Sequence, residues 1–324
     1  MIQKLSIRNF KSVRELDLSC RRVNVFIGEP NAGKTNILEA LAFCGSDISY
    51  DTLRTLRTNN PTDVFWDQNP GVPLTINLDS DMRSIERSND VWFVTDLRDG
   101  ELLYADSLNA NHFSMKKGHK LRELAAYYVF GTPDSLWQEE VKSDALCPPD
   151  GRNLAALLYA NKDARSSSSQ FFANSGFRLM VDYSAKGLKL AKEKDDVLVA
   201  LPYQASSETL RRMVFFHLAI DSNKERILAF DEPEAHAYPP YTKILAEKMA
   251  KDDRGNQFFL TTHSPYMLTS LIEKTPVDEL NVILCRMENF ETKAYVMNEE
   301  QKGQLLEWGM SAFYNFDRLV DKES

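Results

Sequence analysis

Apolar and polar residues alternate along the first part of the chain. Ile2, Leu5 and Ile7 are apolar among polar neighbours, and the alternation continues through residues 10–18. A period of two residues is typical of strands that bury one face, so the pattern predicts an antiparallel pair of strands. The next segment, residues 23–27, is rich in β-branched and aromatic residues, which predicts a short buried strand.

The strand predicted at 23–27 leads directly into residues 28–35, Gly-Glu-Pro-Asn-Ala-Gly-Lys-Thr. This segment has the spacing G-x-x-x-x-G-K-[ST] of a phosphate-binding P-loop. Glycines let the chain turn tightly enough to aim several backbone N–H groups at one triphosphate. A helix is predicted next, and its N-terminus would point at the same phosphates. The apolar residues that recur at the spacing of one helical face are Ile37, Leu38, Leu41 and Ala42.

The P-loop predicts a site for ATP and Mg²⁺. Lys34 is expected to reach the β- and γ-phosphates, and the Thr35 hydroxyl is expected to bind Mg²⁺. The ATP-binding residues predicted from this segment are Asn31, Ala32, Gly33, Lys34, Thr35 and Asn36.

Residues 45–150 have the least regular pattern. The elements predicted there are strands at 72–78, 91–95 and 102–104, a turn at 98–101, and a helix that runs into a strand at 120–130. Residues 115–120 form a small basic cluster, interpreted as solvated surface because no wider basic footprint accompanies it. We expect residues 45–150 to be an insertion within a single ATPase domain that spans residues 1–324.

A Pro-Pro-Asp-Gly segment at 148–151 interrupts the chain before its second half. The elements predicted after it are the start of a helix at 153–159, a polar loop at 165–170, and strands at 177–183, 186–190 and 197–201. The sequence contains no internal repeat and no sustained heptads, so a long coiled coil is not expected.

Four apolar residues followed by two acids occur at 227–232, Ile-Leu-Ala-Phe-Asp-Glu. A buried parallel strand would carry the acids out at its C-terminal end, where α/β proteins bind ligands. Asp231 is predicted to hold Mg²⁺, directly or through water, and Glu232 is predicted to be the catalytic general base. The P-loop lysine lies 197 residues earlier (231 − 34), so the two segments predict both halves of one ATP site.

A second apolar run, residues 257–260, ends in Thr-Thr-His-Ser-Pro. It follows the Asp-Glu pair by about one βαβ unit, with residues 245–250 as the crossover helix. His263 is therefore predicted to be a catalytic residue close to the γ-phosphate.

Ser206 and Ser207 precede apolar residues at helical spacing. One interpretation is an ordinary helix N-cap. The other is an ATP-binding helix N-terminus offered to a phosphate. Since the P-loop already fills that role for the chain's own nucleotide, the ATP would be bound to another copy of the chain.

Composition narrows the classes of function. The chain has 324 residues and a net charge of −8, so nucleic-acid binding has no general basic signature and any DNA contact is local or made through a partner. No apolar run approaches the roughly 20 residues of a membrane span, and the N-terminus does not resemble a signal peptide. A cytoplasmic protein without a membrane partner is expected. The four cysteines and five histidines show no disulfide or metal-ligand spacing.

The order of these segments resembles the ABC-type P-loop ATPases of the RecF, SMC and OLD group. The segments that carry the resemblance are the P-loop, the Ser-rich helix start, Asp-Glu-Pro-Glu-Ala-His at 231–236 and Thr-His-Ser-Pro at 262–265. Residues 7–12 are similar to the group's N-terminal strand, and residues 150–156 to a segment of OLD-like AAA ATPases. The resemblance implies an α/β fold with a mostly parallel core sheet, an N-terminal antiparallel β lobe and a helical lobe.

The resemblance also implies a mechanism. Two copies clamp two ATP molecules head to tail, each between one chain's P-loop and the other chain's signature helix. Ser206 or Ser207 would contact the γ-phosphate across the interface. Glu234 and Ala235 would lie in the loop that meets the partner, and His263 would be the switch histidine. Hydrolysis would shift the population towards the open form.

Three features depart from the group. Glu208 stands at or next to a signature position that is often glycine, where a carboxylate would repel a triphosphate, although an acid in a helix's first turn is favourable. Gln138 is the candidate for the Q-loop glutamine. Only 61 residues follow His263 (324 − 263), too few for the TOPRIM nuclease of OLD proteins in addition to the closing strands and helix.

The favoured interpretation is a slow Mg²⁺-dependent ATPase that forms a homodimer and controls a separate effector, such as a nuclease, in antiphage defence or DNA maintenance. DNA is a further candidate partner. The alternatives are the ATPase subunit of a membrane transporter, a non-hydrolysing ATP-sensing scaffold and a self-contained nuclease.

Overall fold

The computed structural model describes residues 1–46, 49–89, 91–109, 124–131, 133, 135–137 and 144–316. The basic cluster at 115–120, the first part of the helix predicted at 120–130, and Gln138 lie outside these residues. None of the helices described has the length and apolar character needed to cross a membrane.

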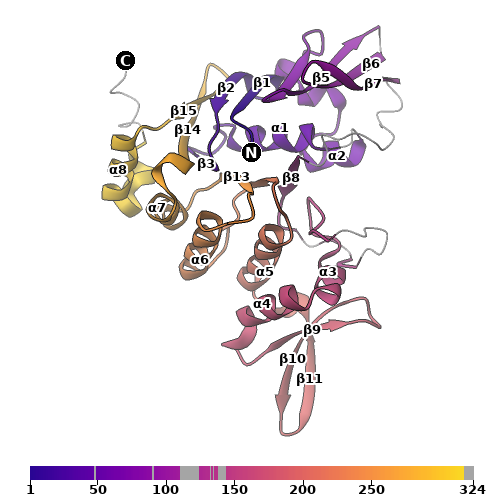
Figure 1. The fold of residues 1–324 in the computed structure, drawn as a ribbon, viewed down its shortest axis with the longest axis vertical. Helices are drawn as coiled ribbons and strands as arrows, with labels where there is room; N and C mark the ends of the chain where they lie inside the picture. Colours follow the sequence, from indigo (N-terminus) through magenta and orange to yellow (C-terminus); the bar gives the residue numbers. More distant parts are fainter. Residues whose placement is uncertain are drawn as a thin grey trace.

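A six-stranded, mostly parallel sheet forms the centre of the fold, with the order β15-β14-β3-β13-β12-β8 (Figure 1). Its strands are β3 (Val23–Ile27), β8 (Ala125–Tyr128), β12 (Ile227–Phe230), β13 (Gln257–Thr261), β14 (Leu280–Glu288) and β15 (Glu291–Val296). Only β15 pairs antiparallel to its neighbour. The strands predicted before the P-loop, before Asp231 and before His263 are confirmed, and they lie together in the order β3-β13-β12. Their carboxyl ends therefore meet at one edge.

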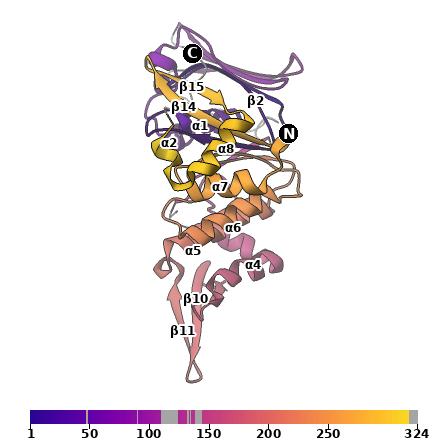
Figure 2. The same cartoon turned by 90° about the vertical axis from the view of Figure 1, so that its left-hand side faces the viewer.

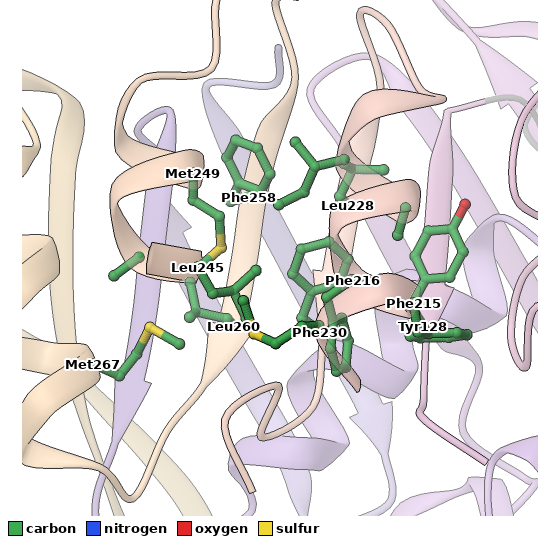
Figure 3. Packing of buried hydrophobic residues seen from close by; sticks show 14 of the residues in the cluster. Tyr128, Phe215, Phe216, Leu228, Phe230, Leu245, Met249, Phe258, Leu260 and Met267 are labelled. Carbon is green, nitrogen blue, oxygen red and sulfur yellow. The ribbon is translucent and has the colours of Figure 1, made fainter. Parts of the chain in front are cut away.

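Side chains of the central strands alternate between two apolar cores. In β12, Leu228 and Phe230 enter one core, while Ile227 and Ala229 enter the other. The first core packs against α5 (Glu208–Asp221), α6 (Pro239–Ala250) and α7 (Pro265–Lys274), as Figure 3 shows for part of it. Burial of both faces explains why β12 is apolar throughout and does not alternate. The predicted crossover helix at 245–250 is the second half of α6.

The second core lies between the central sheet and an antiparallel sheet with the order β2-β1-β4-β5-β6-β7. The strands of this sheet are β1 (Lys4–Phe10), β2 (Val13–Ser19), β4 (Leu74–Leu78), β5 (Asp81–Ser88), β6 (Val91–Arg98) and β7 (Glu101–Asn109). Helix α1 (Lys34–Cys44) contributes its apolar face to this core. The predicted N-terminal antiparallel lobe is therefore confirmed.

Strand β5 has no counterpart in the sequence prediction. Its sequence is rich in charged and polar residues, and one of them, Arg83, is fully buried. Its guanidinium Nε lies 2.8 Å from Oδ1 of Asp96, which is also fully buried. The turn predicted at 98–101 is confirmed, with φ angles of 52° at Asp99 and 79° at Gly100 that suit a tight hairpin.

A helical region with a small sheet projects from the end opposite the antiparallel lobe (Figure 1, Figure 2). Its elements are α3 (Leu154–Ala160), α4 (Lys162–Ala173), β9 (Arg178–Asp182), β10 (Gly187–Lys194) and β11 (Val197–Pro202). The three strands form a sheet of their own, β11-β10-β9. They confirm the strands predicted at 177–183, 186–190 and 197–201.

The polar loop predicted at 165–170 is wrong, because these residues lie inside α4. The side chain of Asn161 caps this helix by accepting hydrogen bonds from the backbone N–H groups of Asp163 and Ala164, both at 3.0 Å. Phe172 is fully buried near the helix end. Capping and packing therefore outweigh the low helix propensity of the serine run.

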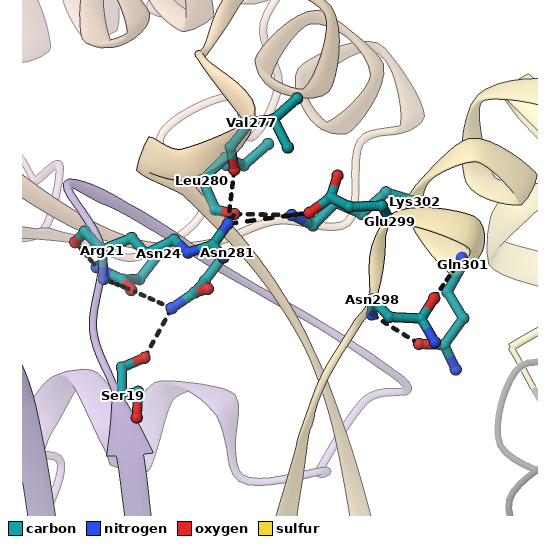
Figure 4. A network of polar contacts seen from close by, with 10 residues as sticks. All are labelled: Ser19, Arg21, Asn24, Val277, Leu280, Asn281, Asn298, Glu299, Gln301 and Lys302. Atoms are coloured by element: carbon teal, nitrogen blue, oxygen red, sulfur yellow. Dashed lines mark hydrogen bonds and ion pairs between the residues drawn. The ribbon is translucent and has the colours of Figure 1, made fainter.

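A polar network fixes the start of β14 against the segment between β2 and β3 (Figure 4). Nδ2 of Asn281 donates to Ser19 O at 2.7 Å and to Asn24 Oδ1 at 3.1 Å. Nη1 of Arg21 donates to Val277 O at 2.6 Å. These bonds hold β14 beside β3 and so place it next to the P-loop. The remaining elements are α2 (Tyr50–Thr55), α8 (Glu299–Trp308), η1 (Pro61–Val64), η2 (Trp66–Gln68), η4 (Tyr203–Ala205), η5 (Val277–Glu279) and η6 (Gly309–Tyr314).

Candidate nucleotide-binding site

The P-loop joins β3 to α1 at the carboxyl edge of the central sheet. Gly28 and Gly33 have φ angles of 141° and 82°, which side chains disfavour. A Cβ built on Gly28 would lie 2.2 Å from Cys285 O, and one on Gly33 would lie 1.8 Å from Thr292 Oγ1. Glycine is therefore required at both positions by backbone conformation and by the close approach of β14 and β15.

Lys34 is the first residue of α1, and its ammonium folds against the loop that precedes it. Nζ donates hydrogen bonds to Gly28 O at 2.9 Å and Glu29 O at 2.7 Å. Burial lowers the pKa of Lys34, and the nearby acids Glu232 and Asp231 oppose that shift. The lysine thus places a positive charge inside the loop, where phosphate oxygens can replace the two carbonyl acceptors.

Thr35 and Asp231 meet across the carboxyl edge of the sheet. Oδ1 of Asp231 accepts hydrogen bonds from Thr35 Oγ1 at 3.0 Å and from Thr261 Oγ1 at 2.6 Å. The Thr261 hydroxyl in turn accepts from the backbone N–H of Glu232 at 3.0 Å. A hydroxyl and a carboxylate are hard oxygen ligands of the kind that Mg²⁺ prefers, so Thr35 and Asp231 fit the predicted metal site.

Glu232 and His263 follow neighbouring strands and face each other. Nε2 of His263 lies 3.6 Å from Oε1 of Glu232, and their side chains are 37% and 46% exposed. Partial burial lowers the pKa of His263, and the Lys34 ammonium lowers it further. Glu232 has a φ of 43°, an uncommon backbone conformation for a side chain of this kind. A half-exposed carboxylate held in this way can reach a water molecule in the space above the P-loop.

A cavity of about 330 Å³ joins these groups. The predicted residues that line it are Asn31, Ala32, Gly33, Lys34, Thr35, Asn36, Glu232 and His263. Asp231 contacts the lining residue Thr35. In the part of the chain that the structure describes, no group of three or more His, Cys, Asp or Glu residues is arranged to hold a metal ion.

The chain matches a known protein family over most of its length. A model of the AAA ATPase domain matches residues 1–196 and 206–268. The chain belongs to this family. The matched residues include the P-loop, the strand end that carries Asp231 and Glu232, and the strand end that carries His263. The site therefore lies within the part of the chain that matches the ATPase domain.

A short segment of the chain is similar to RecF, one of the proteins named in the resemblance. The DNA replication and repair protein RecF of three Clostridium perfringens strains is 41% identical over 54 residues, which are 16% of this chain and 15% of RecF. The match therefore spans only a small part of either protein.

Two solved structures have the same fold as this ATPase domain. The first is the SMC head bound to the C-winged helix domain of ScpA, with a TM-score of 0.56 and 15% sequence identity; the match covers 93% of this chain and 99% of that chain. The second is the SMC head domain with an extended coiled coil bound to the C-terminal domain of ScpA derived from Pyrococcus furiosus, with a TM-score of 0.54 and 12% sequence identity; the match covers 94% of this chain and 98% of that chain. The expected ABC-type α/β fold is confirmed.

Ser206 and Ser207 lie away from this cavity at the start of α5. Oγ of Ser206 donates to Tyr203 O at 2.6 Å. Ser207 is the N-cap residue of α5, but its side chain makes no capping hydrogen bond. Ser207 therefore occupies the predicted N-cap position but does not cap the helix with its side chain. The contact of Ser206 or Ser207 with a nucleotide of another copy stays a prediction.

Glu208 forms contacts that the sequence did not reveal. Its Oε1 lies 2.9 Å from Nε of Arg212 and 3.2 Å from Nδ1 of His236. Hydrogen bonding to Arg212 lowers the pKa of Glu208. Thr209 Oγ1 also donates to His236 O at 3.0 Å. The carboxylate is thus turned along its own chain, and it ties the start of α5 to the loop after β12.

Sequence reasoning missed some residues that line the cavity, among them Ser12 and Arg57. Oγ of Ser12 accepts from Asn36 Nδ2 at 2.6 Å, so the opening Phe-Lys-Ser segment reaches the P-loop helix. Nε of Arg57 donates to Oε1 of Glu39 at 2.8 Å, and Nζ of Lys11 donates to Oε2 at 2.6 Å. Residues 7–12 were recognised only by resemblance, and no pattern around residue 57 points to a phosphate.

Proposed function

We propose that this protein binds ATP with Mg²⁺ in the cavity above the P-loop, hydrolyses it slowly, and uses ATP to join two copies that control a separate effector. The observation that carries the proposal is the meeting of Thr35, Asp231, Glu232 and His263 over one P-loop. These residues come from three segments of the chain, and each has the chemistry that one step of ATP hydrolysis requires.

The chain's own groups divide the chemistry between them. Lys34 exchanges the carbonyl oxygens of Gly28 and Glu29 for phosphate oxygens. Thr35 and Asp231 would hold Mg²⁺, and the bound metal would neutralise phosphate charge. Glu232 accepts a proton from the attacking water, and His263 contacts the γ-phosphate from the neighbouring strand end.

The proposed dimer would bring a helix N-terminus to the cavity that the chain does not supply to its own cavity. The N-terminus of α5, with Ser206 and Ser207, does not line the chain's own cavity, although a helix N-terminus suits a phosphate. A second copy placed head to tail would supply this group to the γ-phosphate. ATP would then hold the two copies together, and hydrolysis would favour their separation.

The proposed effector is a separate protein. The segment shared with RecF and the fold shared with SMC heads that bind ScpA support a partner protein and a role in DNA maintenance. Antiphage defence is the second setting that the sequence favours. DNA itself would bind locally or through the partner.

Phosphate release measured with and without Mg²⁺ tests the activity, and sedimentation with and without ATP tests the dimer. We expect slow Mg²⁺-dependent turnover in the parent and an ATP-stabilised dimer in Glu232→Gln. Lys34→Ala is expected to abolish binding of ATP. Unchanged turnover in Glu232→Gln would exclude Glu232 as the base. Tight ATP binding without phosphate release in the parent would instead indicate an ATP-sensing scaffold.

A further inference from the structure

Glu234 is a buried carboxyl group next to the proposed catalytic residues. It is 7% exposed, although it follows Glu232 by two residues in a loop that is expected to meet a partner chain. Its Oε1 accepts hydrogen bonds from the Thr262 hydroxyl and, at 3.1 Å, from the backbone N–H of His263. The side chain therefore faces the strand end that carries the histidine.

The contacts of Glu234 define the conformation of the segment around His263. Thr262 Oγ1 also accepts from the backbone N–H of Ser264 at 3.0 Å, and Ser264 Oγ caps helix α7 through Met267 N at 3.3 Å. His263 is thus held between the cap of α7 and the carboxyl group of Glu234. The orientation of the His263 imidazole relative to β13 depends on both the α7 cap and the contacts of Glu234.

Burial of this carboxyl group is unfavourable by itself. Oε2 is buried and has no hydrogen-bond partner in the structure. Burial raises the pKa of Glu234 to about 7, while the hydrogen bonds from Thr262 and His263 oppose the shift. A buried acid with one unsatisfied oxygen is destabilising compared with an apolar side chain of the same size. A role in the function of the site accounts for an acid at this position better than stability does.

We propose that Glu234 is a positioning residue, which holds the imidazole of His263 towards Glu232 and the γ-phosphate through its hydrogen bonds to Thr262 and the His263 backbone. This inference rests on the proposed ATPase function. Glu234 is not among the residues that line the cavity, so in this proposal it acts on catalysis only through His263.

The test is a double-mutant cycle between Glu234 and His263, with kcat, KM and the affinity for a non-hydrolysable ATP analogue as readouts. Glu234→Leu is expected to lower kcat roughly 10- to 100-fold with KM and analogue affinity nearly unchanged, because misplacement of a catalytic group has effects of this size. Glu234→Gln keeps an acceptor oxygen for both donors and is expected to retain kcat within about threefold at neutral pH. In the His263→Ala background, Glu234→Leu is expected to change kcat by less than about twofold.

The proposal would be overturned if Glu234→Leu lowered kcat by the same factor in the His263→Ala background as in the parent background. It would also be overturned if Glu234→Leu left kcat unchanged in the parent background. Should Glu234→Leu fail to fold, as judged by circular dichroism, Thr262→Val gives the same test by removing one of the two donors. Its loss of kcat must also vanish in the His263→Ala background, or the proposal is wrong. The matched control is Thr275→Val, a buried threonine at the other end of α7, which is expected to leave kcat unchanged.

Failure of the proposed function has a different signature. If the parent shows no Mg²⁺-dependent phosphate release, or if Lys34→Ala is as active as the parent, the ATPase proposal is overturned before the cycle begins. The parent and Lys34→Ala can behave as expected while the effects of Glu234→Leu and His263→Ala on kcat are additive. In that case the ATPase proposal stands and the role of Glu234 is overturned.

Discussion

Thr35 and Asp231 are 196 positions apart in the sequence, yet the Thr35 hydroxyl donates a 3.0 Å hydrogen bond to the Asp231 carboxylate. The contact exists because β3 and β12 flank β13 in one parallel sheet, and both strands end at the same edge. The fold therefore brings together a hydroxyl and a carboxylate, two oxygen groups of the kind that Mg²⁺ prefers.

This relationship predicts the effect of Asp231→Asn. An amide has no negative charge and binds Mg²⁺ weakly, so we expect ATP turnover to fall by at least roughly 100-fold and the Mg²⁺ requirement to rise. The measurement is phosphate release at several Mg²⁺ concentrations. Asp253→Asn, an exposed acid away from the site, serves as the control and should match the parent. Full activity of Asp231→Asn would remove Asp231 from the metal site.

Glu208 predicts a change in dimer formation. Its carboxylate pairs with Arg212 and His236 at the start of α5, close to where a partner's γ-phosphate is proposed to bind. In Glu208→Gln a negative charge is removed and Arg212 is released, so ATP-dependent dimerisation should tighten several-fold.

The measurement is sedimentation of Glu232→Gln with ATP, with and without the added Glu208→Gln substitution. Glu225→Gln, at an exposed position, is the control. A weaker dimer would show that the Glu208 contacts shape the interface and do not oppose the nucleotide.

Most of the central sheet could be predicted because its strands carry their own signals. Residues 23–27, 227–230 and 257–260 are mostly apolar, with Asn24 and Gln257 as the exceptions, as expected for parallel strands buried on both faces. The P-loop and the acids and histidine at strand ends follow from the same logic, since parallel strands end at one edge. These signals are local, so one sequence is enough to find them.

The remaining features depend on contacts between distant residues. Arg57 lines the cavity only because Glu39, in α1, orients its guanidinium. The inward orientation of Glu234 depends on Thr262, which follows it in the sequence only after α6 and β13. Helix α4 differs, because its Asn161 cap is local and the low helix propensity of its serine run is what misleads the prediction. The other two pairings have no fixed spacing in the sequence.

Strand β5 was missed for the same reason, and it yields a prediction about stability. Arg83 and Asp96 are both fully buried and form an ion pair at 2.8 Å. Arg83→Met leaves the carboxylate of Asp96 without its main partner, so the free energy of unfolding should fall by about 3–5 kcal/mol. Urea denaturation measures this change.

Two controls accompany that substitution. The double variant Arg83→Met with Asp96→Leu should recover most of the lost stability, because no charge is then buried alone. Arg54→Met removes a surface pair whose side chains are 80% and 92% exposed, and it should change stability by less than about 1 kcal/mol. Equal effects of Arg83→Met and Arg54→Met would contradict the buried pairing.

The last prediction concerns the pH dependence of stability at Glu234. Burial raises the pKa of Glu234 from 4.5 to about 7 in the folded protein, so the folded state favours the neutral form. Between pH 4.5 and 7 the folded chain therefore holds a proton that the unfolded chain releases, and the contribution of Glu234 to stability falls as pH rises through this window.

Glutamine at position 234 does not titrate. The stability of Glu234→Gln relative to the parent should rise between pH 5 and pH 8 by on the order of 2–3 kcal/mol. Urea denaturation of both proteins at each pH measures it, repeated in the His263→Ala background to remove the titration of the neighbouring imidazole. A difference that is constant across this pH range would show that Glu234 is ionised in the folded protein throughout.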